Sequence, residues 1–219
     1  MMSKGQGTTA REAARLYLVT PPVGDPAALA DDLAAALKAA DVAAVLLRLA
    51  PADEHTLISR IKALGAIVQS GGAALLLDGH AGIAARAGAE GAHLAGIDAF
   101  GAALPALKPE RIAGCGGLAT RHDAMLAAET GADYVMFGEP DAGGQRPSFE
   151  AVLERIEWWA EVFQIPCVGY AASLDEVEAL SDARADFVAV GDLVWNDARG
   201  AAAAIAAVAQ HLAVTEPVR

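Results

Sequence analysis

Short apolar runs alternate with longer Ala-rich amphipathic stretches along most of this chain. Each apolar run has the length of a β-strand, and most of the intervening stretches are long enough for a helix. Such alternation predicts parallel strands joined by helical crossovers. We expect the strands at 16–19, 45–49, 73–77, 91–94, 111–115, 133–137, 166–169 and 186–190.

Eight strand–helix units in a chain of 219 residues predict one α/β domain, a closed (β/α)8 TIM barrel. We place this barrel at residues 14–213, with its last helix over about 199–212, after a flexible tail at residues 1–13. Active sites of such barrels lie at the C-terminal ends of the strands. The residues that follow each apolar run are therefore the candidates for chemistry.

Helix-start signals support this division of the chain. Asp25 is followed by a proline, a pairing typical of a helix N-terminus. Ser173 and Glu176 have the spacing of a capping box, and Thr120 and Asp123 have the same spacing with Asp as the second partner. Each signal falls between two predicted strands, as a helical crossover requires.

Composition excludes several classes of protein. The net charge of −12 argues against nucleic-acid binding, which needs a basic patch. No apolar run approaches the roughly 18 residues of a membrane span, and residues 1–12 lack the apolar core of a signal peptide. We expect a cytoplasmic protein. Cys115 and Cys167 form no CxxC pair and no zinc spacing, so we expect two buried thiols, with a reactive thiol as the alternative.

The predicted strand ends gather charged side chains around one opening. Asp78 and Glu139 each follow an apolar run and lie beside a glycine, so both carboxylates should face that opening. Two carboxylates, together with waters and phosphate oxygens, are ligands that suit Mg²⁺. A structural role in their loops is the alternative. The other rim candidates are Arg48, His80, Asp141, Gln145, Arg146, Tyr170 and Asp192.

Two histidines are candidates for hydrogen bonding or proton transfer. His93 lies within an apolar strand, where it is either a satisfied core residue or an interior group that bonds a ligand or orients Asp78. His122 falls in the first turn of a predicted helix. The positive end of that helix favours a neutral imidazole, which would suit a proton shuttle. The alternative for His122 is an ordinary surface position.

Barrels of this type often bind phosphate at the loops after the seventh and eighth strands. In this sequence those loops are Tyr170-Ala171-Ala172 and Gly191-Asp192. The backbone N–H groups of Ala171 and Ala172, at the start of the next helix, are suited to an anion. Asp192 would repel a phosphate and would instead cap the helix or bind a hydroxyl or cationic group.

Several short segments along the chain carry a likeness to a known family. They are LYLVT at 16–20, VLLR at 45–48, Leu75–Asp78, GAEGAHL at 88–94, Asp98, GADYVMFG at 131–138, Pro166–Val168 and ADFVAV at 185–190. In this order they resemble the thiamine phosphate synthase family, and the likeness extends over residues 14–212. The resemblance implies a (β/α)8 barrel and a transferase of thiamine biosynthesis that uses Mg²⁺. Such an enzyme joins hydroxymethylpyrimidine diphosphate to thiazole phosphate and releases pyrophosphate.

The resemblance also assigns roles to single residues. Arg48 matches the arginine of the family's Gln-Leu-Arg-x-Lys stretch, although the Gln and Lys positions are Leu46 and Ala50. Arg146 replaces a lysine of the loop after the sixth strand. Arg48 and Arg146 would therefore act on the diphosphate, with Mg²⁺ held by the two predicted carboxylates.

Other positions depart from the family pattern. Asp78 stands at the Asn of an Asn-Asp-Arg segment, whose metal-binding Asp is Gly79 in this chain. Ala171 and Ala172 replace a phosphate-binding Gly-Gly pair, and Asp192 replaces a phosphate-binding Ser. Each change removes a cation, a hydroxyl or a close amide approach, and charge-assisted contacts of this kind contribute roughly 1.5–3 kcal/mol each.

Two alternatives to the synthase stay open at this point. Similar barrels of the same superfamily act as thiazole tautomerases, which need a proton-transfer group such as His122 or Cys115 and no metal. A diverged barrel that binds a phosphorylated ligand without turnover is the other alternative. The expected partner is in every case a phosphorylated small molecule, and a homodimer is compatible with the sequence.

Overall fold

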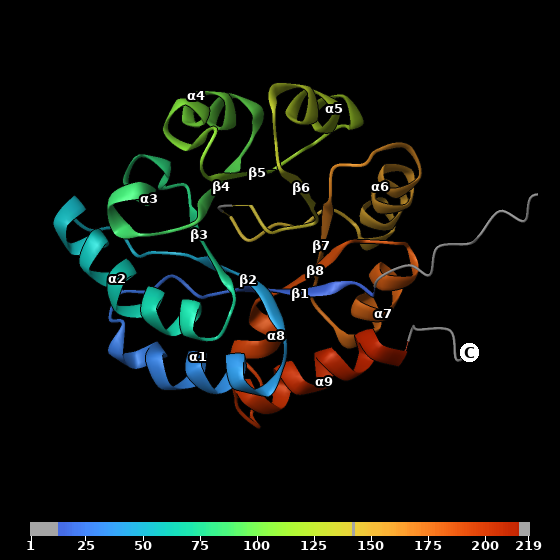
Figure 1. Ribbon diagram of the computed structural model, residues 1–219. Helices are drawn as coiled ribbons and strands as arrows, with labels where there is room; N and C mark the ends of the chain where they lie inside the picture. The colour runs from blue at the N-terminus through green and yellow to red at the C-terminus, as the bar shows by residue number, and fades with distance from the viewer. Residues whose placement is uncertain (1–12, 142, 215–219) are drawn as a thin grey trace, which may run out of the picture.

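The computed structural model describes residues 13–141 and 143–214 and forms a closed barrel of parallel strands in the order β1 to β8. Seen along the barrel axis, the strands form a ring that the helices surround (Figure 1). Helices α1 (Ala27–Ala39) and α9 (Ala201–Val214) pack side by side and complete the outer ring. The predicted single-domain TIM barrel is confirmed. The strands are β1 (Arg15–Val19), β2 (Val42–Leu47), β3 (Ala74–Asp78), β4 (Gly91–Ala95), β5 (Ile112–Gly116), β6 (Tyr134–Phe137), β7 (Cys167–Ala171) and β8 (Phe187–Val190).

Each crossover contains a helix, as the alternation predicts. The predicted tail at residues 1–13 lies outside the described residues except for residue 13. No helix in the described part of the chain is long and apolar enough to cross a membrane. The helices are α1 (Ala27–Ala39), α2 (Glu54–Ser70), α3 (Ala81–Ala87), α4 (Ile97–Leu107), α5 (Arg121–Thr130), α6 (Phe149–Val162), α7 (Leu174–Asp182), α8 (Asp192–Trp195) and α9 (Ala201–Val214).

The strand boundaries agree with the sequence to within a few residues, and β2 is the largest difference. The strand begins at Val42 rather than at residue 45, because Val42 pairs with Leu16 and Ala44 with Tyr17. The residues Val42–Ala44 continue an Ala-rich stretch, so their sequence does not separate strand from helix. Pairing with β1 decides the conformation.

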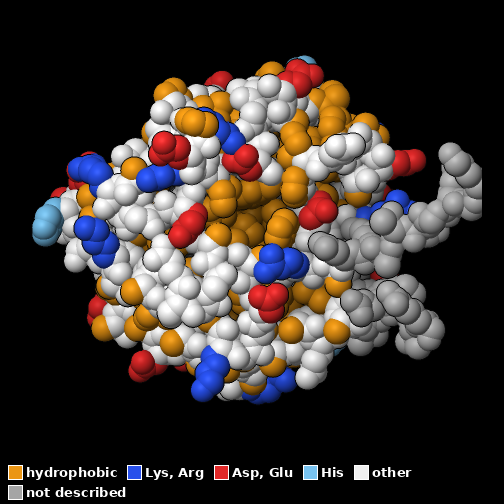
Figure 2. All heavy atoms as spheres, in the orientation of Figure 1, with side chains coloured by type: hydrophobic (Ala, Val, Ile, Leu, Met, Phe, Trp, Pro, Cys, Tyr) orange, Lys and Arg blue, Asp and Glu red, His pale blue; other side chains and the backbone are white. Residues whose placement is uncertain are grey.

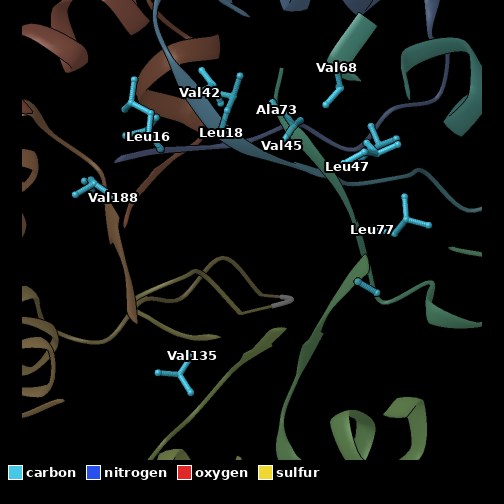
Figure 3. Packing of buried hydrophobic residues seen from close by; sticks show 14 of the residues in the cluster. Leu16, Leu18, Val42, Val45, Leu47, Val68, Ala73, Leu77, Val135 and Val188 are labelled. Carbon is cyan, nitrogen blue, oxygen red and sulfur yellow. The ribbon is translucent and has the colours of Figure 1, made fainter. Parts of the chain in front are cut away.

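Alternating strand residues build two apolar layers. One layer lies between the sheet and the helices, where Leu16, Leu18 and Val45 point outward from their strands (Figure 3). The other layer fills the barrel interior and includes Leu46 and Met136. This inner layer also carries polar groups, and it supports the residues at the C-terminal strand ends.

Strand β5 leaves unusual space inside the barrel because two of its inward positions are glycines. A Cβ atom added at Gly114 would lie 2.0 Å from Cζ of Tyr134. One added at Gly116 would lie 1.9 Å from Oε1 of Glu139 and 2.5 Å from Nε2 of His93. The side chains of neighbouring strands therefore occupy the volume that β5 leaves empty.

One of the two capping boxes predicted from the sequence is complete in the structure, and the other is half formed. Thr120 and Asp123 form a complete capping box at the start of α5. Ser173 accepts a hydrogen bond from the N–H of Glu176 at the start of α7, but the Glu176 carboxylate accepts from the N–H of Ala172 rather than closing a box on Ser173. That carboxylate lies in the predicted phosphate loop.

Figure 2 views the molecule along the same direction as Figure 1 and shows an apolar hollow over the barrel axis with charged side chains around it. Acidic and basic side chains both lie around this hollow, and the whole protein has a net charge of −12. Any anionic ligand of this protein must therefore find a locally favourable position on an acidic molecule.

We expect Gly114→Ala to lower the free energy of unfolding by about 1–3 kcal/mol, because the new methyl group overpacks the interior against the Tyr134 ring. Denaturant unfolding measures the change. Gly101→Ala is the matched control: Gly101 is exposed in α4 with no neighbouring atom in the way, so alanine should stabilise the protein by about 0.5–1 kcal/mol. Equal effects of the two substitutions would contradict this packing.

Candidate active site

The C-terminal strand ends enclose a cavity of about 260 Å³. Its floor is apolar and includes Val19, Leu46 and Met136 from three strands. A mostly apolar pocket with a few convergent polar groups is the usual form of a small-molecule site. The polar side chains that line it are Arg48, Asp78, His93, Glu139, Asp141 and Tyr170.

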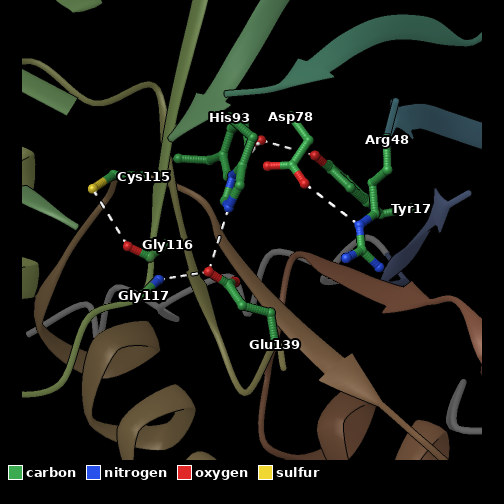
Figure 4. Close-up of polar contacts among 9 residues, drawn as sticks. Tyr17, Arg48, Asp78, His93, Cys115, Gly116, Gly117 and Glu139 are labelled. Atoms are coloured by element: carbon green, nitrogen blue, oxygen red, sulfur yellow. Dashed lines mark hydrogen bonds and ion pairs between the residues drawn. The ribbon is translucent and has the colours of Figure 1, made fainter. Parts of the chain in front are cut away.

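A chain of hydrogen bonds runs through the barrel interior and reaches this cavity. The hydroxyl groups of Tyr17 and Tyr134 lie 2.8 Å apart, and the Tyr134 hydroxyl lies 3.0 Å from Nδ1 of His93. Nε2 of His93 lies 3.4 Å from Oε1 of Glu139, which also accepts a 2.5 Å hydrogen bond from the N–H of Gly117 (Figure 4). The chain therefore joins β1, β6 and β4 to the loop that follows β5.

The chemistry of these groups sets the direction of the hydrogen bonds. Burial raises the pKa of Tyr17 and that of Tyr134 well above the usual value, so both phenols keep their protons. If Tyr17 donates to Tyr134 and Tyr134 donates to Nδ1 of His93, the proton of the neutral imidazole lies on Nε2 and points to Glu139. In each of these hydrogen bonds the acceptor is then the group nearer to the Glu139 carboxylate.

The charge of Glu139 also affects the pKa of His93. Burial of His93 disfavours the imidazolium, but the Glu139 charge, its hydrogen bond and the more distant Asp78 together outweigh burial and raise the pKa of His93. His93 is buried with a partner for each ring nitrogen, as a satisfied core histidine would be, and it also lines the cavity, with Glu139 rather than Asp78 as its neighbour.

Arg48 lies across the barrel from Glu139, since β2 and β6 are four strands apart in a ring of eight. Its backbone N–H donates to Oγ1 of Thr20, which fixes the strand end, and its guanidinium Nε lies 3.5 Å from Oδ2 of Asp78. Both side chains of this ion pair are about 40% exposed (41% and 38%), so the pair is weak and accessible to a ligand.

Arg146 holds the loop after β6 against the end of β7. The guanidinium donates to the carbonyl oxygens of Gly138 and Tyr170 at 2.9 and 2.8 Å, and to Oε2 of Glu176 at 3.0 Å. It also stacks over the Tyr170 ring. The same Glu176 oxygen accepts from the N–H of Ala172. An internal carboxylate thus occupies the loop in which the sequence predicts a phosphate.

The predicted site residues fall into three groups. Arg48, Asp78, His93, Glu139 and Tyr170 line one cavity. Arg146 lines an adjoining pocket that shares Glu139 as part of its wall. The third group lies beyond these two pockets: Ala171 is buried against the helices, and Ala172, Gly191 and Asp192 form the starts of α7 and α8.

Two predicted proton-transfer groups are not brought to the cavity. His122 is exposed in the first turn of α5 and lines a separate pocket together with Asp98 and Asp123. Cys115 points from β5 toward the helices and belongs to the outer apolar layer. Burial and the nearby charges of Glu139 and Asp123 raise the pKa of its thiol to about 12. A role for Cys115 as a reactive group in the mouth is therefore wrong.

Sequence reasoning missed four residues that organise the site: Tyr17, Tyr134, Gly116 and Glu176. The tyrosines lie inside apolar strands and look like core residues. The GCGG segment at 114–117 carries a usable signal, because alternate glycines on one strand face leave space for a neighbour.

The comparisons with known proteins agree with this architecture. A family model described as thiamine monophosphate synthase matches residues 16–194. The thiamine-phosphate synthase of Rhodospirillum centenum is 40% identical over 200 residues, which cover 88% of this chain and 94% of that protein. The thiamine-phosphate synthase of Hyphomonas neptunium is 37% identical over 205 residues, with coverages of 90% and 93%.

The chain belongs to the thiamine monophosphate synthase family. The resemblance found in the sequence, and with it the prediction of a synthase-type transferase, is confirmed at the level of the family. Solved structures agree on the fold. The thiamine phosphate pyrophosphorylase of Pyrococcus furiosus superposes with a TM-score of 0.76 at 19% identity, covering 91% of this chain and 96% of the other. A 3-hexulose-6-phosphate synthase gives 0.68 at 15%, with coverages of 90% and 99%.

The carboxylate oxygens of Asp78 and Glu139 show how well the predicted magnesium site fits this protein. Among residues 13–141 and 143–214, no cluster of three or more His, Cys, Asp or Glu side chains is arranged to hold a metal ion. Asp78 has an exposed carboxylate at the mouth, which fits a hydrated ion that arrives with phosphate oxygens. Glu139 fits less well, because Oε1 is already hydrogen-bonded and Oε2 is buried.

We expect both thiols to be unreactive in the folded protein, because Cys115 and Cys167 have no exposed surface. An aromatic disulfide reagent should react at least about 100-fold more slowly with the native protein than with the denatured protein. The released chromophore measures both rates. Rapid reaction of a native thiol would contradict this burial, and the same assay on Cys167→Ala would show whether Cys115 is the thiol that reacts.

Proposed function

We propose that this chain is a thiamine-phosphate synthase that joins hydroxymethylpyrimidine diphosphate to thiazole phosphate and releases pyrophosphate. Membership in the family supports the reaction. The observation that carries the proposal is the cavity at the C-terminal strand ends, with the guanidinium of Arg48 on one wall and the carboxylate of Glu139 on the opposite wall.

The reaction moves charge rather than protons. The C–O bond between the pyrimidine methylene and the diphosphate breaks, and its electron pair leaves with the diphosphate. The lone pair of the thiazole nitrogen then forms the new C–N bond, and the ring becomes a thiazolium. No proton enters or leaves the substrates in these steps, so the protein contributes positioning and electrostatic stabilisation.

Arg48 is the group we assign to the departing diphosphate. Its only ion-pair partner among the described residues is Asp78, at a distance of 3.5 Å in an exposed pair, so a phosphate oxygen can replace that carboxylate at little cost. A guanidinium that faces the leaving group stabilises the negative charge that develops there. Arg48 therefore accelerates ionisation as well as binding.

Asp78 is the residue that would hold Mg²⁺. A divalent ion held there would supply positive charge that neutralises the leaving group. Arg48 would contact the diphosphate with its own guanidinium. This division of roles uses the exposed carboxylate of the mouth and leaves Glu139 to its hydrogen bonds with His93 and Gly117.

The second substrate carries a single phosphate, and we assign that phosphate to the loop at Ala171–Ala172 beside Tyr170 and the Gly191–Asp192 turn. Arg146 lies next to this loop, but its guanidinium is paired with Glu176. An incoming phosphate must displace the Glu176 carboxylate from Arg146 and from the N–H of Ala172. Glu176 therefore competes with the substrate.

The two alternatives from the sequence differ in their support. A tautomerase-type isomerase has little support, because neither of its candidate proton-transfer residues reaches the cavity. His122 lies outside the cavity and Cys115 faces the helices. A ligand-binding barrel without turnover is favoured by one observation, the internal carboxylate in the phosphate loop. Product formation decides between that barrel and the synthase.

We expect the purified protein, supplied with both substrates and Mg²⁺, to form thiamine phosphate. Loss of one charge-assisted contact in Arg48→Ala should lower kcat/KM by about 10- to 150-fold, corresponding to roughly 1.5–3 kcal/mol. Oxidation of the product to a fluorescent thiochrome measures the rate. Arg15→Ala is the control, because Arg15 is exposed at the opposite end of the barrel beside Asp41. Full activity of Arg48→Ala would contradict the assignment.

Glu176→Gln tests the competition in the phosphate loop. The amide keeps an acceptor for the N–H of Ala172 but removes the charge that holds Arg146. We expect KM for the thiazole phosphate to fall several-fold while KM for the diphosphate stays the same. A higher KM for the thiazole phosphate would show that Glu176 supports the loop rather than competing with its ligand.

A further inference from the structure

Glu139 is a carboxylate of the cavity that the protein holds in a defined position. Its Oε1 accepts from the N–H of Gly117 at 2.5 Å and lies 3.4 Å from Nε2 of His93. Its Oε2 is buried and has no hydrogen-bond partner among the described residues. The side chain is only 16% exposed and lines the cavity. A buried and incompletely satisfied carboxylate is costly to fold, which points to a function for its charge.

The partners of Glu139 fix its position. In its neutral form His93 satisfies both of its ring nitrogens, with the Tyr134 hydroxyl on Nδ1 and Glu139 on Nε2, and it then leaves the charge of Glu139 in place. Gly117 contributes a backbone dipole. No Lys or Arg among the described residues forms an ion pair with Glu139, whereas Asp78 faces Arg48. Asp141, the third carboxylate of the cavity, accepts from the N–H groups of its own loop.

The two walls of the cavity therefore have opposite charge. Arg48 follows β2 and Glu139 follows β6, on opposite sides of the ring. Ionisation of an allylic or benzylic diphosphate creates this same polarity, since the diphosphate becomes more negative and the carbon that it leaves becomes positive. An environment preorganised for the charges of the transition state is the largest contribution that a protein makes to such a step.

We propose that the Glu139 carboxylate is a fixed counter-charge that stabilises the positive methylene carbon formed as the diphosphate departs toward Arg48. This inference rests on the proposed synthase reaction and deepens it. The C–O bond breaks with its electron pair on the diphosphate, the carbon becomes cationic between the two walls, and the thiazole nitrogen then supplies the pair for the C–N bond. Glu139 makes no covalent bond and transfers no proton.

The same proposal explains why the interior polar chain and the β5 glycine are present. His93, Tyr134 and Tyr17 are positioning residues, since they hold the carboxylate through successive hydrogen bonds rather than touching the substrate. Gly116 allows the carboxylate to lie against the strand, where any side chain would collide with Oε1. The low-dielectric interior strengthens the action of the charge on a nearby cation.

The test is Glu139→Gln, which keeps the shape and the acceptor for Gly117 but removes the charge. We expect kcat to fall by about 10- to 100-fold, on the scale of losing one preorganised electrostatic group. Affinity for inorganic pyrophosphate with Mg²⁺, measured by calorimetry, should stay the same or increase, because a negative charge has left the cavity. Glu139→Asp keeps the charge and should recover part of kcat. Glu161→Gln, exposed on α6, is the matched control with unchanged kinetics.

Each outcome separates the inference from the reaction on which it rests. If the wild-type protein forms no thiamine phosphate, the synthase and the counter-charge are both overturned. If the wild type is active and Glu139→Gln keeps kcat within twofold, only the counter-charge is overturned. A loss of kcat accompanied by an equal loss of pyrophosphate affinity also overturns it, because that pattern indicates a collapsed pocket. Tyr134→Phe, with a smaller decrease in kcat, checks the positioning chain independently.

Discussion

The close approach of side chains to the backbone of β5 is the constraint on which the site depends. Gly114 and Gly116 face the barrel interior, and their missing side chains make room for the Tyr134 ring and for the contact between His93 and Glu139. A barrel of this size is normally filled by branched apolar residues. In this barrel two inward positions of β5 have no side chain, and the polar side chains of Tyr134, His93 and Glu139 fill the volume.

A polar chain in a core is stable only if its members satisfy one another. Tyr17, Tyr134 and His93 do so, and the chain ends at a carboxylate that also receives a backbone N–H. Within this chain of hydrogen bonds the incompletely satisfied atom is Oε2 of Glu139, at the end nearest the cavity; Nε of Arg111, just before β5, is the other such atom among the described residues. The cost of burying the polar chain is therefore greatest beside the cavity.

The sequence predicts the fold well because strand–helix alternation is a repeated signal, and errors at single boundaries do not change it. It also finds the residues just after strands, such as Asp78 and Glu139, since their position follows from strand direction alone. It predicts Cys115 and Cys167 as buried thiols, which is confirmed, but it leaves open a proton-transfer role for Cys115 because the side that a strand residue faces depends on a shift of one position. It fails for the pair of Arg146 and Glu176 because the partners are 30 residues apart and meet only through the packing of loops.

The internal ion pair at the start of α7 has a consequence for how a ligand associates. Arg146 and the N–H of Ala172 already hold an anion, the carboxylate of Glu176. The loop is therefore ordered before any substrate enters, and little conformational entropy remains to be lost there. Under the proposed assignment of the thiazole phosphate to this loop, arrival of a phosphate becomes an exchange of one anion for another. The strength of phosphate binding is then the difference between the affinity of the loop for phosphate and its affinity for the Glu176 carboxylate. A change at this one carboxylate would therefore change how readily the product dissociates.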